Sequence, residues 1–230
     1  MKKKVFIGIF AHPDDESFGP SGTLALQIKD GADVFLVLAT DGSGGNNPDN
    51  HNQLGEVRLQ EWRAAGRLLG VKKQFYLGYE DGKLSNNLFV DIANKVEKII
   101  VEICEQYNDM AEINLISMDQ NGISGHIDHI VMSYVSCFVY TKLRIKYSQI
   151  NRLWLTCITR EILPEADTSF VFRSKGRSEN EIDLSVDITE VYELKKSIMR
   201  AHKSQRDDAE MIIARTESSP KKTENFYYFT

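Results

Sequence analysis

Residues 5–16 read VFIGIFAHPDDE, and this stretch determines how the rest of the chain is interpreted. The apolar run at its start is typical of a strand that is buried on both faces of a parallel sheet. The run ends at His12 and at three acidic residues within the next four positions. Three carboxylates this close together repel one another, so we expect a cation among them. A divalent metal held by His12 and Asp15 would leave Asp14 free to handle a proton.

The acidic turn has a second interpretation as a helix start. An acidic N-cap and further acidic residues in the first turn suit the positive end of a helix dipole. This interpretation suits Glu16, which we expect to fasten the turn or a nearby helix end. It gives no role to His12.

Length and charge limit the function classes of the chain. With 230 residues, it is long enough for one well-buried domain, which we expect to span residues 1–230. A net charge of -5 argues against nucleic acid as a partner bound by bulk electrostatics. No apolar segment approaches the roughly 18 residues of a membrane span. The three cysteines are widely spaced and are interpreted as buried free thiols, so we expect a soluble, cytoplasmic protein.

Apolar runs alternate with helical patterns along the first 160 residues. After the first strand we expect strands at 34–39, 75–77, 113–117 and 153–158, and helices at 21–29, 56–69, 88–107 and 128–143. The first strand, helix and strand fit one right-handed βαβ unit. We therefore predict an α/β fold that is Rossmann-like, with a mostly parallel sheet flanked by helices.

The last third of the chain has a weaker pattern. Short strands are expected at 169–173 and 182–186, and a helix at 189–203. Beyond Gln205 the pattern dissolves into charge until the aromatic cluster FYYF at 226–229, which we interpret as a final edge strand. These segments would add extra strands to the sheet in the C-terminal third.

Histidines and acids cluster at two places, in residues 12–16 and in the HIDH sequence of residues 126–129. If the strand order is 3-2-1-4-5, the strands before these clusters are neighbours at the switch point of the sheet, where ligands gather. The order alone would then bring together residues more than 100 positions apart. Two histidines and an aspartate with one open position form a set that suits hydrolytic zinc, which acidifies a water to a pKa of about 7.

AHPDDE at residues 11–16 and HIDH at 126–129 resemble the two signature motifs of the PIG-L/LmbE family, zinc-dependent de-N-acetylases that act on N-acetylglucosaminyl conjugates. Other segments agree, in the expected order up to about residue 205: Thr40-Asp41-Gly42, Arg58-x-x-Glu61, Leu69-Gly70, Leu77-Gly78, Asp81-Gly82-x-Leu84 and His202-x-Ser204-Gln205. The resemblance implies that His12, Asp15 and His129 bind Zn²⁺ and that Asp14 is the general base. Another divalent transition metal, such as Fe²⁺, is an alternative.

The remaining catalytic roles follow from the chemistry of amide hydrolysis. Asp14 would take a proton from the attacking water, and His126 would donate a hydrogen bond to the oxyanion. Asp128 would orient a histidine from behind. The leaving amine also needs a proton, and the sequence does not decide whether Asp14 or His126 supplies it.

Three more residues match family positions near the substrate. Arg58 and Asp81 would hold sugar hydroxyls, because a guanidinium fork and a carboxylate can each bridge a diol. Outside the family context they would be a helix-surface arginine and a turn aspartate. His202 would contact the substrate or support the site from behind.

These observations predict a hydrolase of linear amide bonds that removes the N-acetyl group from an N-acetylglucosamine-type conjugate. An amidase of the same family that cuts a larger acyl group is an alternative. A metal-free Rossmann nucleotide-binding protein is disfavoured, because no G-x-G-x-x-G follows the first strand and three carboxylates would repel a pyrophosphate. A non-catalytic sugar-binding relative is also disfavoured, since every catalytic position is filled. The expected partner is a small amino-sugar conjugate, and the sequence allows a homo-oligomer.

Overall fold

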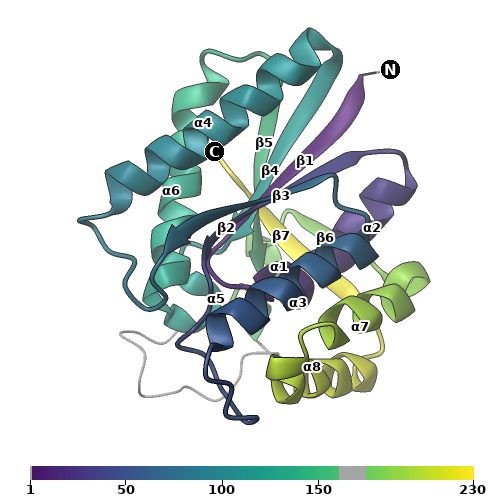
Figure 1. The fold of residues 1–230 in the computed structure, drawn as a ribbon. Coiled ribbons are helices and arrows are strands. Elements are labelled where there is room, and N and C mark those ends of the chain that lie inside the picture. Colours follow the sequence, from purple (N-terminus) through teal and green to yellow (C-terminus); the bar gives the residue numbers. More distant parts are fainter. Residues whose placement is uncertain (1, 161–174) are drawn as a thin grey trace.

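The computed structural model describes residues 2–160 and 175–230. Within these residues, strands form one seven-stranded sheet in the order β3-β2-β1-β4-β5-β7-β6 (Figure 1). The strands are β1 (Lys3–Phe10), β2 (Asp33–Thr40), β3 (Lys73–Tyr79), β4 (Ala111–Met118), β5 (Ile150–Cys157), β6 (Leu184–Asp187) and β7 (Thr223–Phe229). Strands β1 to β5 are parallel, whereas β7 is antiparallel to both β5 and β6. The predicted α/β fold and the 3-2-1-4-5 strand order are confirmed.

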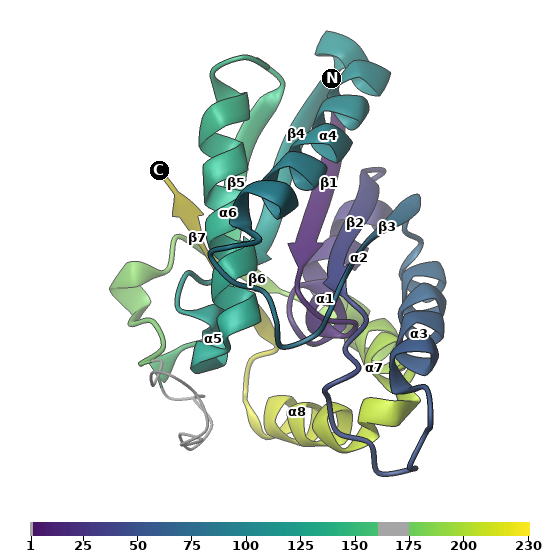
Figure 2. The same cartoon turned by 60° about the vertical axis from the view of Figure 1, so that its left-hand side comes forward.

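Helices cover both faces of the sheet (Figures 1 and 2). The described helices are α1 (Asp15–Phe18), α2 (Ser21–Lys29), α3 (Leu54–Leu69), α4 (Phe89–Tyr107), α5 (Gly122–Gly125), α6 (Ile127–Arg144), α7 (Tyr192–Arg200) and α8 (Arg206–Ser218). One apolar core lies between the sheet and α4 with α6, and a second lies between the sheet and α2, α3 and α7. In β1, Val5, Ile7 and Ile9 belong to the first core and Phe6 and Phe10 to the second. This two-sided burial explains the unbroken apolar run of the strand.

Most predicted helix ends agree with the structure to within two residues. The helix predicted at 56–69 begins at Leu54 and ends where expected. It ends because Gly70 adopts a left-handed conformation with φ of 87°, which glycine accepts without steric cost. The helix predicted at 189–203 is shorter, because 3₁₀ turns at Thr189–Val191 and Lys203–Gln205 flank α7.

The C-terminal third differs from the prediction in two respects. The charged stretch beyond Gln205 forms α8, which buries Ala209 and Ile213 against Met199 of α7. The aromatic segment at 226–229 belongs to β7, but β7 lies between β5 and β6, so its prediction as an edge strand was wrong. The strand predicted at 169–173 lies outside the described residues.

Cys104, Cys137 and Cys157 are free and buried, as predicted. Burial raises the pKa of each thiol to about 12, so all three are unreactive near neutral pH. Among the residues that the structure describes, no helix is long and apolar enough to cross a membrane.

Candidate active site

The turn that follows β1 carries the first cluster of candidate residues. Its shape is set by Asp15, whose Oδ2 accepts hydrogen bonds from the backbone N–H groups of Ala11 at 3.1 Å and His12 at 2.8 Å. Asp14 has a φ of 121°, a conformation that is strained for any residue with a side chain. His12, Asp14 and Asp15 are each less than one-tenth exposed as whole residues. The turn therefore holds three polar side chains in a fixed, buried arrangement.

The second cluster lies at the start of α6, beyond the carboxyl end of β4. His126 is the N-cap of α6, and its Nδ1 accepts a hydrogen bond from the backbone N–H of Asp128 at 3.2 Å. His129 lies in the first turn, where its Nδ1 is 3.0 Å from the carbonyl oxygen of Gly122. The neighbouring Ile123 has a φ of 64°, which is unusual for a β-branched residue. The loop backbone thus fixes the orientation of both imidazole rings.

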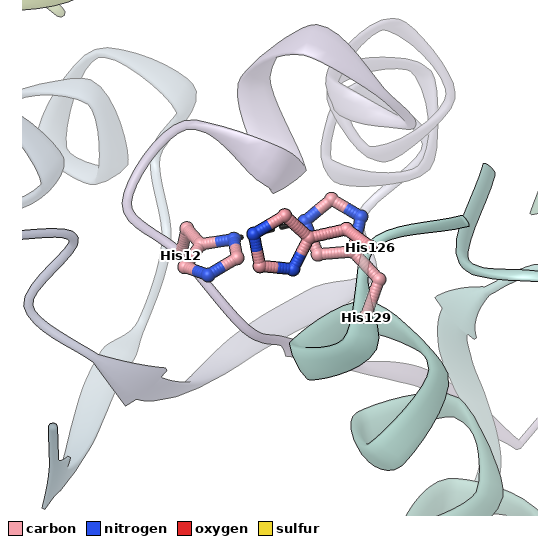
Figure 3. Close-up of side chains that lie close together, drawn as sticks. All are labelled: His12, His126 and His129. Atoms are coloured by element: carbon pink, nitrogen blue, oxygen red, sulfur yellow. Dashed lines mark hydrogen bonds between the residues drawn. The ribbon is translucent and has the colours of Figure 1, made fainter. Parts of the chain in front are cut away.

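The two clusters meet because β1 and β4 are neighbours in the sheet. His12 Nδ1 lies 2.8 Å from His129 Nε2, although the residues are 117 positions apart in the sequence. Asp15 Oδ1 lies 3.3 Å from the same His129 nitrogen, and Asp15 Oδ2 lies 3.8 Å from His12 Nδ1. Figure 3 shows the three histidine rings, with His12 on the turn after β1 and His126 and His129 at the start of α6.

The second nitrogen of His12 faces two carboxylates. Its Nε2 lies 2.9 Å from Asp81 Oδ1 and 3.4 Å from Asp128 Oδ2. Asp128 also accepts hydrogen bonds from the backbone N–H groups of Gly82 at 2.8 Å and Leu84 at 3.1 Å. Asp81 Oδ2 accepts one from the N–H of Gly44 at 2.8 Å. Backbone N–H groups of two loops therefore hold the two carboxylates that lie beside the His12 ring.

Two overlapping groups of side chains are close enough to hold a metal ion, His12 with His126 and His129, and His12 with Asp81 and Asp128. Imidazole nitrogens and carboxylate oxygens are donors that zinc and other divalent transition metals accept. A tetrahedral ion with bonds of about 2.0–2.2 Å needs donor atoms roughly 3.3–3.6 Å apart, and the donor separations around His12, from 2.8 to 3.8 Å, include this range. The residues present therefore fit a metal.

Arg58 and His202 are both buried and contact other groups of the protein. Arg58 is 4% exposed, and its guanidinium donates to Asp14 Oδ2 at 2.7 Å, Pro13 O at 2.8 Å and Gly42 O at 2.6 Å. His202 is fully buried, with Nε2 2.9 Å from Ser17 Oγ.

Comparison with known proteins places this geometry in a family. The profile of the PIG-L family, described as GlcNAc-PI de-N-acetylase, matches residues 7–138, which is more than half of the chain. The chain belongs to the PIG-L family of de-N-acetylases. Both clusters of the site lie within the matched residues, and the family resemblance identified in the sequence is confirmed.

Individual PIG-L relatives match over most of their length. The 1D-myo-inositol 2-acetamido-2-deoxy-alpha-D-glucopyranoside deacetylase of Corynebacterium glutamicum (strain R) is 30% identical, covering 91% of this chain and 78% of the relative. The probable N-acetyl-alpha-D-glucosaminyl L-malate deacetylase 2 of Bacillus subtilis (strain 168) is 27% identical, covering 90% of this chain and 85% of the relative. The N,N'-diacetylchitobiose deacetylase of Pyrococcus horikoshii has a TM-score of 0.70 with 23% identity, over 99% of this chain and 84% of that one, which shows a shared fold.

Neighbouring carboxylates in this PIG-L site favour the protonated form of His12. Burial opposes protonation of its ring, but the hydrogen bonds to Asp128 and Asp81 and the charge of Asp15 raise the pKa of His12 to about 10. Burial raises the pKa of Asp81, but the hydrogen bond with His12 outweighs it and lowers the pKa to about 2. Burial, together with the charge on His12, lowers the pKa of His129 well below its ordinary value. A bound divalent cation would take the place of the proton on His12, because metals require the neutral imidazole.

Burial disfavours the charged forms of the two aspartates in the acidic turn. Burial raises the pKa of Asp14 to about 7, although the nearby Arg58 guanidinium opposes this shift. Burial likewise raises the pKa of Asp15, against the charge of His12. Both carboxylates are thus poorly solvated in the protein alone, which fits a site that receives a cation.

Several contacts of the site were not predicted from the sequence. The acceptors and donors supplied by Gly122, Gly82 and Gly44 are backbone groups, which leave no trace in side-chain patterns. Ser204 of the 202–205 motif donates to Glu61 of α3 from its backbone N–H at 2.9 Å and its Oγ at 2.6 Å. The motifs Arg58-x-x-Glu61 and His202-x-Ser204-Gln205 contact each other through these bonds. Their joint presence in the sequence was the signal from which this contact could have been predicted.

Proposed function

We propose that this chain is a zinc-dependent hydrolase that removes the N-acetyl group from an N-acetylglucosamine-type conjugate. The observation that carries this proposal is the meeting of His12, Asp15 and His129 beside Asp14, a carboxylate left over for proton transfer. The names of the three relatives share a 2-acetamido sugar and differ in what is attached to it. The shared sugar, rather than any one attached group, is therefore the proposed recognition element.

We assign the metal to His12 Nδ1, Asp15 and His129 Nε2. In this arrangement the other ring nitrogen of each histidine keeps a protein partner, Asp128 for His12 and the Gly122 carbonyl for His129. Such partners are the usual support of metal-binding histidines. In the alternative set with Asp81 and Asp128, the Asp128 Oδ2 that faces His12 already accepts the backbone N–H of Gly82 at 2.8 Å.

When bound, the ion would acidify a water and polarise the acetyl carbonyl. Asp14 is the proposed general base, taking a proton from the attacking water as the water oxygen bonds to the acetyl carbon. His126 is the proposed oxyanion donor. Because its Nδ1 accepts the backbone N–H of Asp128, the ring proton is assigned to Nε2, which would donate to the carbonyl oxygen as negative charge develops.

The second half of the reaction breaks the bond between the acetyl carbon and the sugar nitrogen. The products are acetate and the free amine, so the nitrogen must gain a proton as it leaves. Asp14, which has taken a proton from water, supplies it. The neutral His126 assigned above keeps its single ring proton on Nε2, because giving it up would leave an imidazolate anion.

A screen of N-acetylglucosamine conjugates for released amine tests this function. Protein purified without chelators is expected to contain one divalent metal per chain and to release acetate from at least one conjugate. Conjugates of the same sugar that carry longer acyl groups distinguish a deacetylase from a family amidase that removes a larger acyl group. A metal-loaded protein that releases amine from none of these compounds would refute the proposed activity.

A further inference from the structure

A buried ion pair lies at the start of the segment that leads from β4 to α6. Asp119 directly follows β4 and is 1% exposed. Arg177 binds both of its carboxylate oxygens, donating from Nε to Oδ2 at 2.7 Å and from Nη2 to Oδ1 at 2.8 Å. We infer that Arg177 is a positioning residue for His129 and that it acts through Asp119. This inference rests on the proposed function, in which His129 is a metal ligand.

Asp119 shapes the backbone that follows it. Its Oδ1 accepts the backbone N–H of Asn121 at 3.1 Å, and its carbonyl oxygen accepts the N–H of Gly122 at 2.7 Å. Aspartate favours such turns because its short side chain can hydrogen-bond the backbone two residues on. The turn ends at Gly122, which has a φ of 70°. The position of Asp119 therefore fixes the direction of the Gly122 carbonyl group.

The Gly122 carbonyl connects this turn to the metal site. Its oxygen lies 3.0 Å from Nδ1 of His129, which Figure 3 shows at the start of α6. Because a carbonyl only accepts, the ring proton is assigned to Nδ1, and Nε2 faces Asp15 Oδ1 at 3.3 Å. A Cβ atom on Gly122 would lie 3.2 Å from His129 Cβ, so the turn packs directly against this histidine. The turn therefore sets both the tautomer and the orientation of the His129 ring.

Arg177 is itself held on two sides. Its backbone N–H donates to the carbonyl oxygen of Ile158, just after β5, at 2.9 Å. Its guanidinium lies 3.9 Å from the centroid of the Tyr227 ring in β7, and the Tyr227 hydroxyl donates to Asp119 Oδ1 at 3.3 Å. A planar guanidinium can bind a carboxylate through two bonds and lie against a ring at once, whereas a lysine ammonium is a compact point charge. The pair thus connects the C-terminal part of the sheet to the turn before α6.

Zn²⁺ affinity, measured on the metal-free protein by competition with a chromophoric chelator, tests this inference without a substrate. Arg177→Met should weaken Zn²⁺ binding by about 10-fold, the lower end of the effect of groups that orient metal ligands, because Gly122 keeps its carbonyl. Arg177→Lys keeps a positive charge beside Asp119 but loses the fork, so it should fold and still bind Zn²⁺ more weakly. Arg152→Met is the matched control, since this exposed arginine lies 4.5 Å from the Tyr228 ring centroid in the same sheet. It should bind Zn²⁺ as the wild type does.

A purely structural role for Arg177 gives a different result. It would lower the midpoint of urea unfolding but leave the Zn²⁺ affinity of the folded protein unchanged, because the ligands would keep their arrangement. Wild-type Zn²⁺ affinity in either folded Arg177 variant would therefore overturn the inference.

NMR of the imidazole nitrogens in the metal-free protein provides a second readout. In the wild type, His129 should carry its proton on Nδ1, and in Arg177→Met part of the population should carry it on Nε2. Weaker Zn²⁺ binding with the wild-type tautomer would also overturn the inference, because the loss would then not act through the Gly122 contact.

Failure of the proposed function is distinguishable from failure of this inference. A wild-type protein that binds Zn²⁺ but deacetylates no conjugate would refute the activity, whereas the affinity and tautomer comparisons use no substrate and would still decide the role of Arg177. If the wild type binds no Zn²⁺, the proposed metal chemistry fails, and the tautomer comparison alone decides whether Arg177 positions His129.

Discussion

Replacing Lys195 with Met tests how strongly the fold depends on a buried ion pair behind the acidic turn. Lys195 and Glu224 are 3% and 7% exposed, and Nζ lies 2.6 Å from Oε1. Nζ also donates to the carbonyl oxygen of Gly19 at 2.5 Å, directly after α1. Glu224 accepts the backbone N–H groups of Gly22 at 2.9 Å and Thr23 at 2.7 Å, in the first turn of α2. The pair therefore ties β7 and α7 to the chain that follows the acidic turn.

The expected loss of stability is large for a single substitution. Removing one partner of a buried ion pair costs about 3–5 kcal/mol, because the other charge is left without compensation. Lys195→Met should lie near the lower end, at about 3 kcal/mol, since Glu224 keeps two backbone donors and the dipole of α2. In a chain of 230 residues this corresponds to a decrease in Tm of about 6–12 °C.

Urea unfolding followed by circular dichroism measures this loss. Lys195→Met should shift the midpoint without changing the m value, which depends on the surface exposed on unfolding. The double variant with Glu224→Gln should be less destabilised than the sum of the single variants. Lys142→Met is the control, because the pair of Lys142 with Glu97 is partly solvated and should contribute little. A Lys195→Met midpoint equal to that of Lys142→Met would refute the reasoning.

Three further predictions concern the site and the response to acid. Asp14→Asn should keep bound metal but lose nearly all deacetylation, whereas Asp15→Ala should lose the metal; equal metal loss in both, measured by elemental analysis, would contradict the assigned roles. His126→Ala should lower kcat by about 100- to 1,000-fold, as expected for loss of an oxyanion donor, while metal occupancy stays unchanged. A metal-free His126→Ala protein would identify His126 as a ligand instead. Although burial raises the pKa of Asp33, hydrogen bonds, of which that from Lys72 is the largest, lower it to about 2. Its stabilisation is therefore complete above an unfolded-state pKa of about 3.9 and is lost as pH falls toward 2. Asp33→Asn should show a smaller loss of stability over that interval in acid unfolding, and an unchanged slope would contradict the pKa shift.

The sequence predicted the elements that depend on continuous apolar patterns. β1 shows why: its residues are buried alternately in two cores, so every position is apolar and the strand end at His12 is sharp. The helix α8 was missed because only Ala209 and Ile213 are buried in a charged segment, too few to produce a helical period. The position of β7 inside the sheet was missed because aromatic residues suit edge and central strands alike.

The sequence predicted where the site forms better than how each side chain is used. His12 and His129 could be brought together by strand order alone, because parallel strands end at the same edge of the sheet. The partners of Arg58 could not be predicted in this way, since two of them are the carbonyl oxygens of Pro13 and Gly42. Any residue at those positions offers the same acceptor, so no pattern of residue types reveals it.

The acidic turn combines features that each cost stability, and their concentration at one edge of the sheet is consistent with a functional site. Asp14 is strained at its backbone, and Ile123 is strained across the site from it. Among the described residues, Glu16 Oε2, Arg58 Nε and His202 Nδ1 are buried without a hydrogen-bond partner. The two apolar cores lie on either side of β1, directly before the acidic turn, and their burial of apolar side chains offsets this cost. A bound cation would relieve the repulsion among the carboxylates, so metal and fold should stabilise each other.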